Sequence, residues 1–167
     1  MRSYSFHSLE ILSISINKIV FTLSLFLLLP IVAFGATLGF SPASGSYQSG
    51  SVFTVNVYAN SNGTAFNALS GVVSYPKDLL DVVSISKGQS IISLWVQEPS
   101  FSNTAGTVNF EGIVLNPGYN GSNGKVLTVT FKVKSVGVAN LSFSSGSILA
   151  NDGEGSEIIS GKGTAQF

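Results

Sequence analysis

Residues 127–134 alternate strictly between apolar and polar side chains, and this pattern constrains the fold more than any other feature of the chain. The apolar members are Leu127, Val129, Phe131 and Val133, and the polar members are Thr128, Thr130, Lys132 and Lys134. An alternation with a period of two is typical of a β-strand with one face on a core and one face in water. Residues 51–59 repeat the pattern almost as cleanly.

Short β-rich segments continue along the chain and are separated by Gly, Asn, Ser and Pro, which are typical of turns. After Ala36 no helical periodicity of useful length is present. The expected strands span residues 38–40, 51–59, 68–75, 80–86, 90–97, 107–115, 125–134, 139–144, 147–150 and 158–167. Regularly spaced short strands predict an all-β sandwich or barrel, and 167 residues are enough for one domain.

The N-terminal residues 1–35 are predicted to be a signal peptide. A mostly apolar run over residues 19–34 follows Lys18, and small residues at Ala33 and Gly35 precede an expected cleavage between Gly35 and Ala36. The alternative is an uncleaved N-terminal anchor, because the segment before Lys18 is long for a signal. Either way, the folded domain is expected to span residues 36–167.

Composition argues against an enzyme. The chain has no cysteine, and its one histidine, His7, lies in the predicted signal. Residues 36–167 therefore lack the groups needed for a Ser-His-Asp triad, a Cys-His pair or a zinc site of the usual ligands. Their carboxylates show no pattern of a facing acid–base pair. A formal net charge of +0 gives no reason to expect nucleic acid as a partner, and no cofactor is predicted.

Three segments, in this order, resemble the cohesin modules of bacterial cellulosomes. They are residues 71–83 (GVVSYPKDLLDVV), 124–134 (GKVLTVTFKVK) and 141–153 (LSFSSGSILANDG). The resemblance implies a nine-stranded jelly-roll β-sandwich related to certain carbohydrate-binding modules. It also implies that the domain binds a dockerin module on another secreted protein, with the dockerin bringing its own calcium.

The resemblance also indicates a recognition face, a flat sheet of the family's third, fifth, sixth and eighth strands. In typical members, an Asn and an Asp two positions apart on the third strand carry much of the contact. Alignment on Tyr75 places Ala68 and Ser70 at these positions, which indicates a divergent member. Asn151 and Asp152 match the family's loop after its eighth strand.

Three further polar residues are expected to extend this face: Ser74, Asn109 and Glu111. The alternative is that they belong to an ordinary solvated sheet surface. The loop of residues 151–155 is rich in oxygen ligands and glycine, but it lacks the ligand spacing of an EF-hand, so a plain turn is favoured over a calcium site.

Trp95 is the only tryptophan of the chain. On a sheet face it would anchor a partner or stack on a sugar ring, whereas the alternative is a core residue between the sheets. In a regular strand, Ser93 and Gln97 would share its face.

The resulting hypothesis is a secreted, non-catalytic interaction module. A carbohydrate-binding module that uses Trp95 with Tyr47, Tyr58 or Tyr119, and an adhesive surface protein, remain as alternatives. A polysaccharide is thus a second possible partner, and membrane attachment is expected only if the N-terminal segment stays uncleaved.

Overall fold

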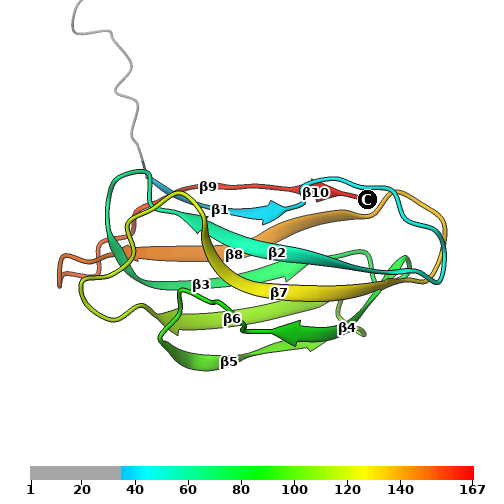
Figure 1. The fold of residues 1–167 in the computed structure, drawn as a ribbon, viewed down its shortest axis with the longest axis horizontal. Coiled ribbons are helices and arrows are strands. Elements are labelled where there is room, and N and C mark those ends of the chain that lie inside the picture. The colour runs from blue at the N-terminus through cyan, green and yellow to red at the C-terminus, as the bar shows by residue number, and fades with distance from the viewer. Residues whose placement is uncertain (1–34) are drawn as a thin grey trace, which may run out of the picture. The chain divides into compact units, whose positions relative to one another are not determined.

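The computed structural model describes residues 35–167, which form two five-stranded β-sheets that pack face to face (Figure 1). The strands are β1 (Ala36–Ser41), β2 (Val52–Asn60), β3 (Phe66–Ser74), β4 (Leu80–Ser86), β5 (Leu94–Ser102), β6 (Thr107–Ile113), β7 (Gly124–Val133), β8 (Asn140–Ala150), β9 (Ile159–Lys162) and β10 (Ala165–Gln166). Residues 35–167 contain no helix that is long and apolar enough to cross a membrane. The predicted signal or anchor lies outside the described residues, except for Gly35.

The first sheet has the order β4-β7-β2-β1-β9, and the second has the order β10-β8-β3-β6-β5. Neighbouring strands are antiparallel, except that β1 and β9 are parallel. This arrangement confirms the expected all-β jelly-roll sandwich. Each sheet has one face on the shared core and one face toward solvent.

The alternating segment of residues 127–134 is the second half of β7, and its apolar side chains are buried as expected. Val126 is also buried, because a register shift between Val57 and Tyr58 turns two consecutive β7 residues toward the core. Phe131 lies near the centre of the core, and its ring centroid is 5.7 Å from that of Phe53 on β2. The sequence pattern therefore predicted the strand and its inner face, but not the bulge.

β5 begins four residues later than the segment predicted over residues 90–97. The preceding residues pass from one sheet to the other: Ile91 N donates to Lys125 O on β7, and Ser93 N donates to Ile113 O on β6. Ile92, between them, is buried in the core. An apolar segment that crosses between two sheets has the composition of a strand, which explains the difference.

The end of the chain differs from the prediction in a similar way. The predicted strand over residues 158–167 divides into β9, which pairs with β1, and β10, which pairs with β8 in the other sheet. If β9 and β10 are counted as one segment, the strands number nine, as in the expected architecture. Conversely, the segments predicted at 139–144 and 147–150 join into the single strand β8, which accommodates a bulge opposite Val72 and Val73.

Candidate functional site

The outer face of β8, β3, β6 and β5 is the surface on which the sequence-predicted site residues gather. Along β3, the side chains of Leu69 and Val73 are buried, whereas those of Ala68, Ser70 and Ser74 alternate outward. This strand lies in the middle of the sheet between β8 and β6, so its outward residues have neighbours on both sides. We call this surface the recognition face.

The strand register arranges the recognition face in cross-strand rows. The first row, called the apolar row, consists of Leu149, Ala68, Ile113 and Leu94. The second row, called the polar row, consists of Ser147, Ser70, Glu111 and Gln97. The next two rows contain mainly small polar residues: Ser145, Val72, Asn109 and Ser100, then Ser142, Ser74, Thr107 and Ser102. Ala68, Ser70, Ser74, Asn109 and Glu111 therefore share one face.

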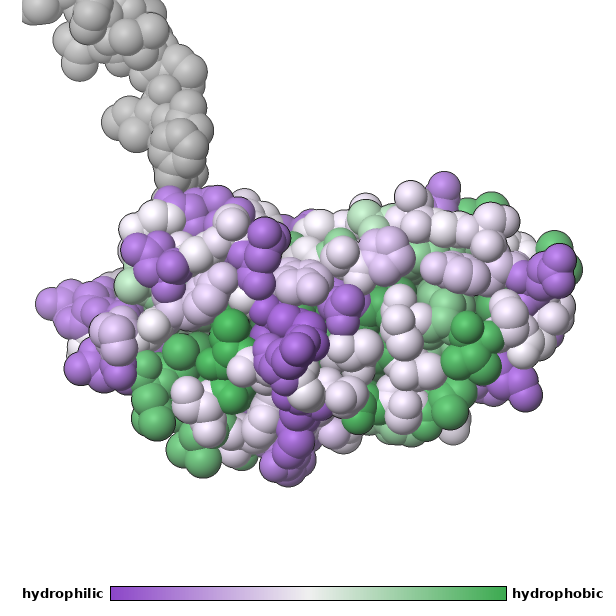
Figure 2. All heavy atoms as spheres, viewed as in Figure 1, coloured by the Kyte–Doolittle hydropathy of each residue, from purple (hydrophilic) through white to green (hydrophobic). Residues whose placement is uncertain are grey.

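A shallow pocket of about 170 Å³ lies where the apolar row meets the polar row. Val96 on β5 projects toward it, and its lining also includes Ala68, Ser70 and Glu111. Val96 and Leu94 are 58% and 57% exposed, which is high for branched aliphatic residues in a strand. Figure 2 views the molecule from the side of the other sheet and shows hydrophobic surface at the lower left edge, where the chain enters β5.

Glu111 is the only charged residue in the four rows, and its side chain is exposed. Among residues 35–167 its carboxylate takes part in no ion pair and accepts no hydrogen bond. Its cross-strand neighbours are Ser70 on β3 and Gln97 on β5, and neither carries a charge that would offset that of Glu111. The carboxylate is thus available to a cationic or hydrogen-bonding group of a partner.

Trp95 does not join the recognition face. Register shifts on both sides of Gln97 disturb β5, and Trp95 lies opposite Gly112, an inward-facing position of β6. Its ring is half-buried and packs against the core, with Lys87 Nζ 6.0 Å from the ring centroid. Trp95 and Gln97 therefore do not share a face, contrary to the expectation for a regular strand.

Asn151 and Asp152 lie in the loop after β8, beyond the apolar row. Asn151 Nδ2 donates to Pro117 O at 2.8 Å, so this side chain joins the loop to the one before β7. Asp152 accepts a hydrogen bond from Glu154 N at 2.9 Å. A hydrogen bond from the Ser156 side chain and the one from Glu154 N lower the pKa of Asp152. Within residues 35–167 no group of His, Cys, Asp and Glu could hold a metal ion.

Sequence reasoning missed four aliphatic contributors to the recognition face: Leu94, Val96, Ile113 and Leu149. Branched aliphatic residues in a strand indicate a core position in most cases. Ile113 follows Glu111 at the same period of two, whereas the outward positions of Leu94 and Val96 depend on the bulges of β5, which could not be read from the sequence. Glu111 lies outward as expected, since it alternates with the buried Val108 and Phe110 on β6.

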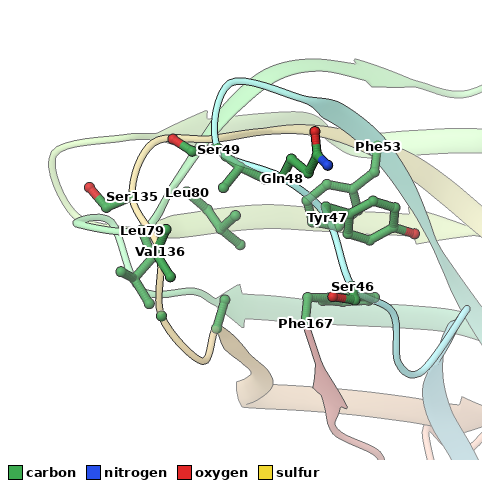
Figure 3. Close-up of a pocket in the computed structure, with 13 residues that line it drawn as sticks. Ser46, Tyr47, Gln48, Ser49, Phe53, Leu79, Leu80, Ser135, Val136 and Phe167 are labelled. Carbon is green, nitrogen blue, oxygen red and sulfur yellow. The ribbon is translucent and has the colours of Figure 1, made fainter.

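A larger apolar pocket of about 340 Å³ opens at the end of the sandwich, between the segments that follow β1 and β7 (Figure 3). Tyr47 stacks on Phe53 with ring centroids 4.1 Å apart, and the Phe167 ring lies 5.0 Å from that of Phe53. One face of the Tyr47 ring is thus covered by the protein itself. The aromatic cluster closes this end of the core.

Solved structures with a similar fold are cohesin modules. A type I cohesin–dockerin complex from Clostridium thermocellum matches with 10% identity and a TM-score of 0.64, over 83% of this chain and 96% of the solved one. The third ScaC cohesin of Acetivibrio cellulolyticus, in complex with a ScaB dockerin, matches with 21% identity and a TM-score of 0.60, over 77% and 96%. A non-cellulosomal cohesin from Archaeoglobus fulgidus matches with 20% identity and a TM-score of 0.59, over 79% and 90%.

At these identities the structural likeness concerns the fold. A search among curated proteins found no significant match. The family model for the cohesin domain matches residues 39–166, from β1 to the last residue of β10. Because this match takes in most of the chain, the protein belongs to the cohesin domain family.

Proposed function

We propose that this chain is a non-catalytic interaction module that binds a dockerin-like module of another protein through the recognition face. The observation that carries the proposal is that a cohesin-family domain presents an apolar row beside a row with one unpaired carboxylate. Ala68, Ser70 and Glu111 lie on β3 and β6, which have a strand neighbour on each side, so this part of the face is held rigidly. A preformed surface with an apolar anchor site and one charge supports specific protein binding.

The chemistry of this face indicates the character of the partner. Ala68 and Ser70 replace the amide and carboxylate of typical cohesins, so β3 supplies little polarity. Glu111, opposite Ser70 on β6, brings a negative charge back to the same row. We expect the partner to place an aliphatic side chain over Ala68 and a Lys or Arg opposite Glu111. Calcium would belong to the partner and stabilise its dockerin fold.

Export from the cell is part of the proposal and rests on the predicted signal peptide over residues 1–35. If the segment stays uncleaved, the domain would be tethered to the membrane and displayed outside. The lack of His and Cys after His7 supports a non-catalytic role.

The experiment is a titration of the full chain with each dockerin module encoded in the same genome, followed by calorimetry. Every titration is run with calcium and with a chelator. We expect saturable binding of at least one dockerin, and only with calcium. Glu111→Lys should weaken that binding by about tenfold or more, because the new charge would repel the partner's cation.

The matched control is Thr54→Lys, which also introduces a lysine, on β2 in the sheet that does not carry the recognition face. Its affinity should equal that of the unmodified chain. The proposal is wrong if no encoded dockerin binds, if the genome encodes none, or if the two lysine variants weaken binding equally.

A further inference from the structure

A second, polar groove lies on the outer face of the other sheet, where β1, β2 and the segment before β7 meet. Its volume is about 500 Å³, within the range of about 300–1,000 Å³ that is usual for small-molecule sites. The residues that matter for its chemistry are Thr37, Gly39, Tyr58, Asn60, Ser122 and Asn123. Figure 1 shows the segment that leads into β7 passing beside β2.

The strand register builds this groove. Gly39 on β1 lies opposite Tyr58 on β2, and Thr37 lies opposite Asn60. The intervening Leu38 and Ala59 are buried, so the paired groove residues alternate outward. On the other side of β2, Ala59 pairs with Gly124, which brings the preceding Ser122 and Asn123 to the same end of the sheet.

The missing side chain of Gly39 makes the hollow. A Cβ atom added at Gly39 would meet nothing within 4 Å, so the space above this residue is open. Gly163 lies beside it, since a Cβ added there would come 3.4 Å from the Gly39 Cα. Backbone without side chains therefore forms a shelf beside the Tyr58 side chain, and one edge of the groove is aromatic.

The polar groups of the groove are largely uncommitted. Among residues 35–167, the side chains of Thr37, Tyr58, Ser122 and Asn123 make no hydrogen bond, and Asn60 uses only Oδ1, which accepts from Asn62 N. No charged residue lines the groove. Lys125, opposite Tyr58 on β7, instead donates to Gln89 Oε1 at 3.1 Å. The groove thus offers hydroxyl and amide groups beside an aromatic ring, without net charge.

We propose that this groove binds a neutral carbohydrate chain, with Tyr58 as the stacking wall and the amides and hydroxyls as partners of the sugar hydroxyls. A sugar ring has apolar C–H faces and a polar rim, so it matches an aromatic side chain flanked by donors and acceptors. An anionic or cationic ligand would find no opposite charge in the lining.

The inference goes beyond the proposed function, because the groove and the recognition face lie on different sheets. One domain would then hold a partner protein on one sheet and a polysaccharide on the other at the same time. The two proposed sites can be tested independently, because neither contributes a residue to the other.

The test is affinity electrophoresis of the full chain in gels with hydroxyethyl cellulose, xylan, galactomannan or laminarin, followed by calorimetry with the hexasaccharide of any retarding polymer. We expect at least one polymer to retard the chain. Tyr58→Ala should weaken hexasaccharide binding by about tenfold, a loss of about 1.4 kcal/mol, because the stacking wall is removed. Gly39→Gln should do the same by filling the hollow.

Gly39 does not have a positive φ, so Gly39→Gln puts no strain on the backbone and keeps the proposal testable if Tyr58→Ala fails to fold. Thr54→Ala, further along β2 on the same outer face, is the control and should bind normally. The proposal is overturned if none of the four polymers retards the chain. It is also overturned if Gly39→Gln binds as well as the control, or if Trp95→Ala abolishes binding while both groove variants retain it.

Discussion

The hydroxyl group of Tyr75 donates a hydrogen bond to Asn103 Oδ1 at 2.7 Å, and Asn103 in turn links the two sheets. Tyr75 follows β3 and Asn103 follows β5, both in the second sheet. The Asn103 amide reaches across to β4 of the first sheet, where Oδ1 accepts from Val82 N at 2.8 Å and Nδ2 donates to Val82 O at 3.0 Å. Since β4 is an edge strand, one asparagine satisfies backbone groups that would otherwise have no strand neighbour.

Replacing Asn103 by alanine should therefore destabilise the domain. Asn103→Ala removes the side-chain partner of both backbone groups of Val82, and it leaves the Tyr75 hydroxyl only its longer hydrogen bond to Ser102 O at 3.2 Å. Each such loss in a partly buried place costs free energy. We expect the free energy of unfolding to fall by about 1–3 kcal/mol. The measurement is urea unfolding followed by tryptophan fluorescence.

Asn123→Ala is the matched control, because the Asn123 side chain is exposed and makes no hydrogen bond within residues 35–167. It should leave the unfolding free energy nearly unchanged. Equal effects of the two variants would show that the bridge from Asn103 to Val82 does not contribute to stability.

The raised pKa of Tyr75 also predicts how the stability of the domain depends on pH. Burial raises the pKa of its phenol above the ordinary 10.0, the nearby Asp81 carboxylate raises it further, and a hydrogen bond with the Val82 backbone opposes both. The folded state therefore holds this proton more tightly than the unfolded state does. The stabilisation is complete below the unfolded pKa and is lost as the pH rises from there through the folded pKa.

The measurement is the urea midpoint at several pH values from neutral to strongly alkaline, for the unmodified chain and for Tyr75→Phe. Phenylalanine has no proton to lose, so the variant should lose less stability over the alkaline range, although it starts from a lower value. Parallel pH profiles for the two proteins would contradict a raised pKa at Tyr75.

The strands with one solvent-exposed face were the part of the fold that the sequence predicted best. In β2, β3, β6 and β7 the apolar period of two identifies the inner face, because burial of alternate side chains dominates the energetics there. Segments that change sheets were predicted worst. Ile91 and Ile92 lie where the chain crosses between the sheets, and their composition does not distinguish a crossover from a strand.

The residues of the candidate site divide in the same way, into those on regular strands and those on irregular segments. Ala68, Ser70 and Glu111 could be assigned to one face because β3 and β6 are regular. Trp95 could not be placed, since its side depends on two bulges of β5 that are defined only by pairing with β6. The groove at Gly39 could not be predicted from the sequence either. It arises because Gly39, which lies opposite Tyr58, has no side chain, and this pairing is defined only by the register of β1 against β2.

Two strand glycines with different surroundings allow a direct test of the packing. A Cβ added at Gly71 on β3 would lie 2.4 Å from Phe110 Cζ, in the buried interior, whereas one added at Gly39 would meet nothing. Gly71→Ala should therefore lower the free energy of unfolding by about 1–3 kcal/mol through displacement of the Phe110 ring.

Gly39→Ala is its matched counterpart and should be neutral or stabilise the domain by up to about 1 kcal/mol, since alanine restricts the unfolded chain more than glycine does. Neither residue has a positive φ, so backbone strain affects neither comparison. Urea unfolding of both variants measures the difference in their unfolding free energies. A similar loss of unfolding free energy in both would mean that displacement of the Phe110 ring adds no cost of its own.

The recognition face allows one last prediction, because Ser70 lies directly opposite Glu111 across β3 and β6. Ser70→Asp brings the carboxylate of a typical cohesin back to this strand, but places it opposite an existing negative charge. Like charges on directly opposed positions repel, so the variant should lose about 0.2–1 kcal/mol of stability at low salt. Part of this loss should disappear at high salt, because both groups are in contact with water.

A double-mutant cycle with Glu111→Gln separates this repulsion from other effects of the aspartate. In the Ser70→Asp/Glu111→Gln protein the aspartate faces a neutral amide, so Ser70→Asp should cost less there than in the unmodified background. Thermal unfolding of the four proteins at low and high salt gives the coupling energy directly. A coupling energy of zero would mean that the two side chains diverge on the outer face, and that Glu111 could not act together with residue 70 in contacting one group of a partner.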